Sequence, residues 1–123
     1  IYQRLSTLGF AEWVSVKVFK AEPDTIQVGI EEANKDFKRI DSLDVDDTER
    51  TSWNALAFRW LREEKRIDCY PVRGFYDESD FFYATVYIDN KKISDEKYDT
   101  HPLAEIAALE KAAEIIEQDN NEN

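Results

Sequence analysis

The amino-acid sequence predicts a single α+β domain over residues 1–118, in which a small antiparallel sheet of three to four strands is packed by two to three amphipathic helices. Three observations predict this class. Some stretches alternate apolar and polar residues, as strands do, and others repeat apolar residues every three to four positions, as helices do. In addition, a chain of 123 residues buries about two-thirds of its unfolded surface, which is enough for a core without disulfides.

The first elements are expected to be a short helix and a strand. Gly9 is suited to the C-cap of a helix at the start of the chain. Val14, Val16 and Val18 then alternate with polar residues, and β-branched residues with a period of two are typical of strands. The sequence therefore predicts a strand over residues 12–20.

A long amphipathic helix is expected after Pro23, which ends that strand. Asp24 precedes Gln27 by three residues, which is the spacing of a capping box. Gly29 within the helix marks a close approach of another segment, because glycine otherwise costs helix stability. The apolar stripe of this helix has spacings of four and three residues and consists of Ile26, Ile30, Ala33, Phe37 and Ile40.

Residues 41–50 are predicted to form an acidic loop, because the hydrophobic pattern loses its period there. A second helix is expected over residues 48–65. Its apolar face consists of Trp53, Leu56, Ala57, Trp60 and Leu61. Cations follow near its C-terminus, where they suit the helix dipole, and Arg59 and Glu63 are spaced for an ion pair. These cations are Arg59, Arg62, Lys65 and Arg66.

Two strands and a partial third are expected next. Residues 68–72 form a short strand that Pro71 confines to a sheet edge or to a strand start. Residues 81–88 form a longer strand, and a turn over residues 77–80 joins the two into a hairpin. A second turn at residues 89–91 leads into a short return strand that starts at Lys92 and Ile93.

The last element is a helix that starts near Thr100, with Pro102 in its first turn. Its inner face is predicted to contain Leu103, Ile106, Ala107, Leu109, Ala113 and Ile116, and its outer face Glu105, Glu110, Glu114 and Glu117. Residues 119–123 are expected to form a frayed acidic tail. The predicted core combines all elements: Val14, Val16, Val18, Ile26, Ile30, Phe37, Trp53, Leu56, Trp60, Phe82, Val86, Ile88, Ile106, Leu109 and Ile116.

Three segments together resemble a known group of proteins. They are NALAFRWLREEKRI over residues 54–67, YATVYI over residues 83–88 and HPLAEIAALEKAAEII over residues 101–116. This combination of a "WLRE" helix with a closing helix rich in Ala, Glu and Leu resembles small proteins encoded by phages and prophages of gut bacteria. That group often has tyrosine where this chain has His101. The resemblance implies a mobile genetic element expressed in the bacterial cytoplasm, and it implies no particular activity.

The charge and the residue counts exclude several classes of function. The net charge is -11, which disfavours binding to duplex nucleic acid and to anionic membranes and favours a basic partner, such as a nucleic-acid-binding protein, or simply solubility. One cysteine and one histidine exclude an intrachain disulfide, a thiolate zinc cluster and a three-histidine zinc site. No glycine-rich phosphate loop and no long apolar run is present. We therefore expect no cofactor, no metal and no membrane span.

Two groups of residues are candidates for binding a partner. The first is aromatic and consists of Phe81, Tyr83 and Tyr87 on one side of a strand, with Tyr70 nearby. Such residues stack on single-stranded nucleic acid, bind proteins, or form core if helices cover both sheet faces. The second group is acidic and consists of Asp41, Asp44, Asp46, Asp47, Glu49, Glu110, Glu114 and Glu117. The loop members lack the glycine and the spacing of a calcium-binding loop.

The sequence predicts a non-enzymatic interaction protein of phage or prophage origin that acts by binding a partner protein. One alternative is an anti-defence inhibitor, of the anti-CRISPR or anti-restriction type, whose acidic residues mimic a nucleic-acid backbone. A further alternative is a small enzyme that uses Cys69 or His101, the two residues with chemistry suited to a nucleophile or a general base. No catalytic residue is assigned, because no complete catalytic constellation is present.

Overall fold

The computed structural model describes residues 1–42, 46–74 and 81–122, with the side chains of residues 121 and 122 excepted. Two compact units make up the chain, Ile1–Trp53 and Asn54–Asn123. The boundary falls within one continuous helix, α4 (Asp47–Trp60). The expectation of a single domain over residues 1–118 stays a prediction.

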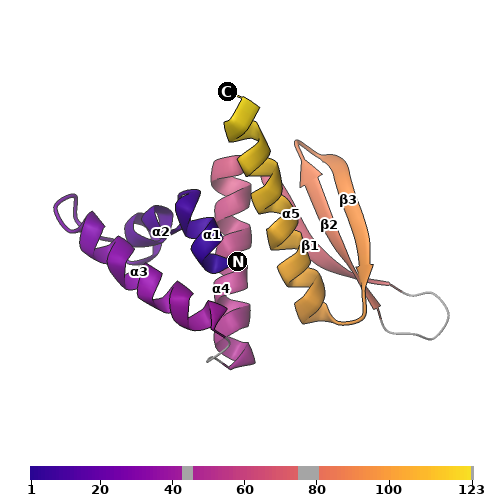
Figure 1. Ribbon diagram of the computed structural model, residues 1–123, viewed down its shortest axis with the longest axis horizontal. Helices are drawn as coiled ribbons and strands as arrows, with labels where there is room; N and C mark the ends of the chain where they lie inside the picture. The colour runs from indigo at the N-terminus through magenta and orange to yellow at the C-terminus, as the bar shows by residue number, and fades with distance from the viewer. Residues whose placement is uncertain (43–45, 75–80, 123) are drawn as a thin grey trace. The chain divides into compact units, whose positions relative to one another are not determined.

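All the regular secondary structure described in the first unit is helical. It contains α1 (Tyr2–Thr7), α2 (Phe10–Trp13), the π-helical turn η1 (Val14–Val18), α3 (Ile26–Asp41) and the start of α4 (Figure 1). Phe37 of α3 is at the centre of its core. The ring of Phe37 stacks on that of Phe10 at 5.1 Å and meets Trp53 edge-on at 5.2 Å, an arrangement that suits aromatic quadrupoles.

The predicted strand over residues 12–20 is wrong, because this segment is helical. Val14 and Val18 are four residues apart, so a helix places them on one side and turns Val16 outward. Val14 is fully buried, whereas 36% of Val16 is exposed. The helix is favoured because Ser15 is also buried and its hydroxyl donates to the carbonyl of Ile26 at 2.8 Å. Packing against α3 has thus overridden the β propensity of the valines.

Gly29 marks a close approach, as predicted. A Cβ atom at this position would lie 2.0 Å from the hydroxyl oxygen of Ser15, so only glycine lets η1 pack this closely against α3. The predicted capping box of Asp24 and Gln27 is wrong: α3 begins one residue later than that box requires, with Thr25 at the N-cap and no side-chain capping bond.

Helix α4 starts one residue before the predicted start at residue 48, within the acidic stretch 41–50 that was also expected to be a loop. Its first turn follows Asp46, whose carboxylate accepts the backbone N–H of Glu49 at 2.8 Å. After Trp60 the helix continues as a π-helical turn, η2 (Leu61–Lys65), which ends at Arg66 in the left-handed conformation.

The second unit contains a three-stranded antiparallel sheet in the order β1 (Ile67–Gly74), β2 (Phe81–Ile88) and β3 (Lys91–Tyr98). Pro71 lies on the edge strand β1, as predicted. The residues of the predicted turn at 77–80 lie outside the described part of the chain. Asp89 and Asn90 both have positive φ, which is typical of a two-residue type I′ hairpin turn, and the return strand is longer than expected.

Helix α5 (His101–Glu122) lies along one face of this sheet and contacts all three strands (Figure 1). Thr100 caps it, as expected, by accepting the N–H of Leu103 at 3.3 Å. Two predicted positions are wrong: Leu103 is largely exposed and Glu105 is buried. The residues that α5 buries are mainly small: Ala104, Ala108, Leu109, Ala112, Ala113 and Ile116. Residues 119–122 lie within the helix.

The predicted α+β class is confirmed, with an antiparallel sheet and amphipathic helices. Eight of the predicted core residues are half-buried and one, Val16, is exposed. Six are buried: Val14, Phe37, Trp60, Val86, Leu109 and Ile116. The sequence pattern missed the N-terminal contribution to the core, which comes from Tyr2, Leu5, Phe10 and Trp13.

Candidate functional site

The strand register divides the sheet of the second unit into two faces. Residues directly opposite each other across antiparallel strands point to the same face. Phe82 of β2 meets His101 of α5 edge-on at 5.3 Å, which identifies the face that α5 covers. Phe81, Tyr83, Thr85 and Tyr87 therefore point to the other face, as the sequence predicted. No further described helix of this unit packs there, so we call this side the open face.

The open face extends over all three strands. Its residues are Asp68, Tyr70, Val72 and Gly74 from β1, Phe81, Tyr83, Thr85 and Tyr87 from β2, and Lys92, Asp95 and Lys97 from β3. Tyr70 and Val72 are each 38% exposed. Exposed aromatic and β-branched residues gathered on one sheet face are typical of an interaction surface.

Aromatic pairs order the rings on this face. Tyr70 stacks on Tyr87 with ring centroids 6.0 Å apart and an interplanar angle of 17°. Phe81 meets Tyr83 edge-on at 5.3 Å. The ammonium group of Lys97 lies 4.1 Å from the centre of the Phe81 ring, a cation–π contact. The rings are thus held in place, which lowers the entropy lost on binding a partner.

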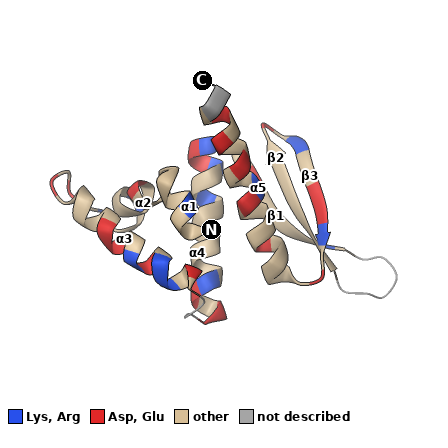
Figure 2. Ribbon diagram, in the orientation of Figure 1, with Lys and Arg blue, Asp and Glu red and all other residues tan. Residues whose placement is uncertain are grey.

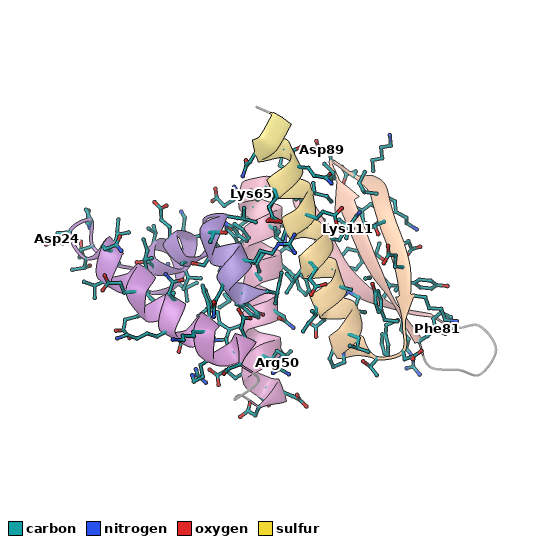
Figure 3. The ribbon with its side chains drawn as sticks, in the orientation of Figure 1. Asp24, Arg50, Lys65, Phe81, Asp89 and Lys111 are labelled. Atoms are coloured by element: carbon teal, nitrogen blue, oxygen red, sulfur yellow. The ribbon has the colours of Figure 1, made fainter. Side chains whose placement is uncertain are left out.

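Gly74 explains why Phe81 is buried although it belongs to the open face. Gly74 lies directly opposite Phe81, and a Cβ atom on Gly74 would come within 1.9 Å of the Phe81 ring. The ring fills the space that the missing side chain leaves. Phe81 lies at the start of β2 (Figure 3), so it closes this end of the open face.

Polar groups on the open face are paired within the sheet. The hydroxyl of Thr85 donates to Asp95 at 3.1 Å, and Lys92 donates to the same carboxylate at 3.2 Å. Burial is the main cause that raises the pKa of Tyr70, and the neighbouring Tyr87 adds to it, so the phenol stays neutral at physiological pH. Two carboxylates and two ammonium groups cancel, which makes this face neutral on a chain of net charge -11.

The edges of the sheet are poor templates for an added strand. Pro71 lacks an N–H group, and it interrupts the outer row of donors on β1. Strand β3 has lysine and acidic residues along its length, and Figure 2 shows its basic ends and acidic middle. Charged side chains on an edge strand oppose pairing with another chain. Binding is therefore expected on the open face and not at the edges.

The acidic residues of the first unit are mostly engaged in structural contacts. Asp41 accepts the backbone N–H groups of Tyr2 and Gln3 at 2.9 and 2.8 Å, so it caps α1. Glu49 makes a bidentate ion pair with Arg39, and this hydrogen bonding is the main cause that lowers the pKa of Glu49.

Asp46 and Asp47 of this acidic group differ in whether their carboxylates are used in structural contacts. Asp46 caps α4, whereas Asp47 is 96% exposed and lies 3.9 Å from Arg50. Asp44 lies outside the described residues. Of the acidic residues whose positions are described between 41 and 49, Asp47 is thus the one most available to a partner.

Figure 2 shows acidic segments spaced along α5, and the three glutamates proposed for partner binding are not buried among the core residues. Glu110 and Glu114 are exposed and Glu117 is half-buried. Glu114 lies 3.5 Å from Lys111, one turn away, and accepts a hydrogen bond from Gln118. These glutamates belong to the second unit, whereas Asp41–Glu49 belong to the first.

The geometry does not favour catalysis by Cys69 and His101. Cys69 is buried, and this burial is the main cause that raises the pKa of its thiol to about 12, so the reactive thiolate is scarce at neutral pH. His101 lies against Phe82, and Phe82 is paired with Arg73 of β1. Because Arg73 is four residues, or about 13 Å, along β1 from Cys69, the imidazole is at the other end of the strand from the thiol. The imidazole Nδ1 of His101 instead lies 3.1 Å from the buried carboxylate of Glu105.

Other candidate chemistries find little support in the residues that are described. No group of three or more His, Cys, Asp or Glu side chains in them is arranged to hold a metal ion. Among the described helices, none is long and apolar enough to cross a bilayer. The basic cluster at the end of α4 is partly paired as predicted, since Arg59 contacts Glu63 at 2.9 Å and Arg62 lies 4.0 Å from Asp68.

Sequence reasoning found the aromatic part of the open face and missed its polar part. Asp95 and Lys97 were not identified, because the return strand was expected to be short. A two-residue loop at Asp89 and Asn90 pairs Ile88 with Lys91. Extending that register without a break would place Glu96 opposite Tyr83, and the irregularity between Val86 and Tyr87 shifts the partner to Lys97.

Comparisons with known proteins add no relative from which function can be inferred. No protein-family model, no curated protein and no solved structure matches the chain. The assignment of a site therefore depends on the geometry of the open face.

Proposed function

We propose that this protein is a non-enzymatic interaction protein that binds a partner protein through the open face of its sheet. The observation that carries the proposal is the ordered aromatic surface of Tyr70, Tyr83 and Tyr87, which one helix leaves uncovered. Tyrosine is enriched in protein interfaces because its ring buries apolar area while its hydroxyl still forms hydrogen bonds. Following the resemblance of its helices to phage proteins, we place this activity in the bacterial cytoplasm.

A protein partner fits this face better than single-stranded nucleic acid does. Nucleic-acid platforms combine aromatic rings with a basic groove that follows the phosphates. Here the two ammonium groups are already engaged, Lys92 with Asp95 and Lys97 with the Phe81 ring. Two carboxylates, Asp68 and Asp95, share the same face. Phosphates would therefore meet no net positive charge.

The proposal is tested by capturing proteins from a bacterial lysate with immobilised protein and quantifying them by mass spectrometry. The double variant Tyr70→Ser and Tyr87→Ser removes the stacked pair. We expect it to lose specific partners by about tenfold or more, since aromatic interface residues are frequent hot spots. The control Phe19→Ser removes another exposed aromatic ring, in the first unit, and is expected to retain those partners.

A second comparison separates this proposal from mimicry of nucleic acid by acidic residues. The triple variant Glu110→Gln, Glu114→Gln and Glu117→Gln reduces the charge of α5 and leaves the open face intact. If the triple variant loses the captured proteins while the tyrosine variant keeps them, mimicry is right and the open face is not the site. Equal capture by the tyrosine variant and the wild type contradicts the proposal, provided that both melt at similar temperatures.

A further inference from the structure

We propose that the open face also binds a second copy of this chain, and that the two copies are related by a two-fold axis parallel to β2. This inference rests on the proposed function and names one occupant of that face. Its basis is the distribution of charge over the three strands. Asp68 lies on one outer strand and Lys92 on the other, at the same level, and this axis lays Asp68 of one copy over Lys92 of the other.

The register of the sheet fixes which residues would meet. Asp68 on β1 and Lys92 on β3 are both paired with Tyr87 of β2, so they are level with each other on either side of the central strand. A two-fold axis along β2 lays β1 of one copy over β3 of the other. Asp68 then faces Lys92 of the second copy, twice per dimer. Both side chains remain about half exposed, at 51%, although within the chain Asp68 lies 4.0 Å from Arg62 and Lys92 lies 3.2 Å from Asp95.

The same axis brings further complementary groups together. Tyr70 and Asp95 are both paired with Thr85, so the phenol of one copy faces the carboxylate of the other. A neutral phenol donates to a carboxylate, and Tyr70 stays neutral because its pKa is raised. Along the axis itself, Tyr83 and Tyr87 of β2 pack on their own equivalents. The neutral face thus places no like charges in contact.

The other face-to-face orientation pairs the charges less completely. An axis perpendicular to β2 lays β3 over β3 with its ends exchanged. When it lays the level of Tyr87 over the level of Phe81, Lys97 of one copy meets Asp95 of the other, but Asp68 faces Gly74 and has no donor opposite it. The axis parallel to β2 places Lys92 opposite Asp68 and Tyr70 opposite Asp95, so both carboxylates of the face have a donor opposite them.

The area of the open face limits the affinity of the dimer. Seen face-on, three strands of eight residues cover about 380 Å², which is roughly half of the 800 Å² that each partner of a stable complex buries. We therefore expect a weak and reversible dimer with a Kd on the order of 100 µM. A weak dimer leaves the open face accessible to a stronger partner at lower protein concentration.

Charge reversal tests the contact between Asp68 and Lys92. Sedimentation equilibrium from about 10 µM to 1 mM brackets the expected Kd. Asp68→Lys and Lys92→Glu alone each place like charges in contact, and we expect each to weaken the dimer about tenfold or more. When the two single variants are mixed, both contacts are again between unlike charges, so a heterodimer is expected at wild-type affinity. Glu110→Lys on α5 is the control and should not change the Kd.

The mixing experiment also controls for folding, because variants that fail only by misfolding do not regain affinity on mixing. The proposed dimer is contradicted if the wild-type chain is monomeric at about 1 mM. It is also contradicted if the single variants dimerise as well as the wild type does. If the dimer is absent while the tyrosine variant still loses captured partners, only this inference fails. If that variant also keeps its partners, the proposed function fails as well.

Discussion

Single residues at close approaches determine how tightly the first unit packs. At Gly29 a Cβ atom would lie 2.0 Å from the hydroxyl oxygen of Ser15 and 2.9 Å from its Cβ. Gly29→Ala gains about 1 kcal/mol of helix propensity. It also overpacks the contact, which costs about 1–3 kcal/mol, and it weakens a buried hydrogen bond worth about 1 kcal/mol.

We therefore expect Gly29→Ala to lower the free energy of unfolding by about 1–3 kcal/mol, as measured by urea denaturation. Val28→Ala changes the neighbouring position, which is 58% exposed, and is expected to have little effect. Stability of Gly29→Ala equal to or above that of the wild type would contradict the close approach of η1 to α3.

The buried thiol of Cys69 predicts a pH dependence of stability. Burial raises its pKa from an ordinary value of 9.0 to about 12, because the folded state favours the neutral thiol. The resulting stabilisation is fully present below pH 9 and is lost as the pH rises from about 9 toward 12. Its loss is at most about 1.4 kcal/mol per pH unit.

Unfolding free energies of the wild type and of Cys69→Ala at pH 8, 9 and 10 check this prediction. As the pH rises, the unfolding free energy of the wild type should fall more than that of Cys69→Ala, since all other groups titrate alike in both proteins. Rapid alkylation of the native thiol by iodoacetamide at pH 8 would argue against its burial.

At the scale of elements, a carboxylate from one helix caps another. Asp41 at the end of α3 accepts two backbone N–H groups at the N-terminus of α1. Asp41→Asn should lower the unfolding free energy by about 1 kcal/mol, because the capping oxygen loses its charge and part of its fit. Asp47→Asn makes the same chemical change at an exposed site and should have little effect. Equal thermal shifts in both variants would show that capping by Asp41 contributes nothing.

At the scale of the whole molecule, the net charge of -11 predicts an unusual response to salt. Two acidic chains repel each other over about 30 Å at 0.01 M salt but only about 10 Å at 0.1 M. The open face itself is neutral, so contacts there are screened little. Self-association should therefore strengthen between 0.01 and 0.1 M salt, as measured by sedimentation. Binding through acidic mimicry would instead weaken steeply over the same range.

Much of the second unit could be predicted from the sequence, because its elements carry local signals. The alternation in residues 81–88 assigned each side chain to the correct face, and Pro71 indicated an edge strand. Thr100 and Pro102 indicated where the last helix starts. These signals depend only on neighbouring residues, so they could be recognised without knowledge of the tertiary structure.

The sequence by itself determined the α+β class, the edge position of the strand with Pro71 and the aromatic side of β2. Only the tertiary structure decided that Val14–Val18 is helical, because the burial of Ser15 against α3 depends on a glycine in another element. It also decided that one helix covers the sheet, which leaves Tyr70 and Val72 exposed. A periodic pattern shows which residues share a face, whereas what covers that face depends on packing between segments distant in the chain.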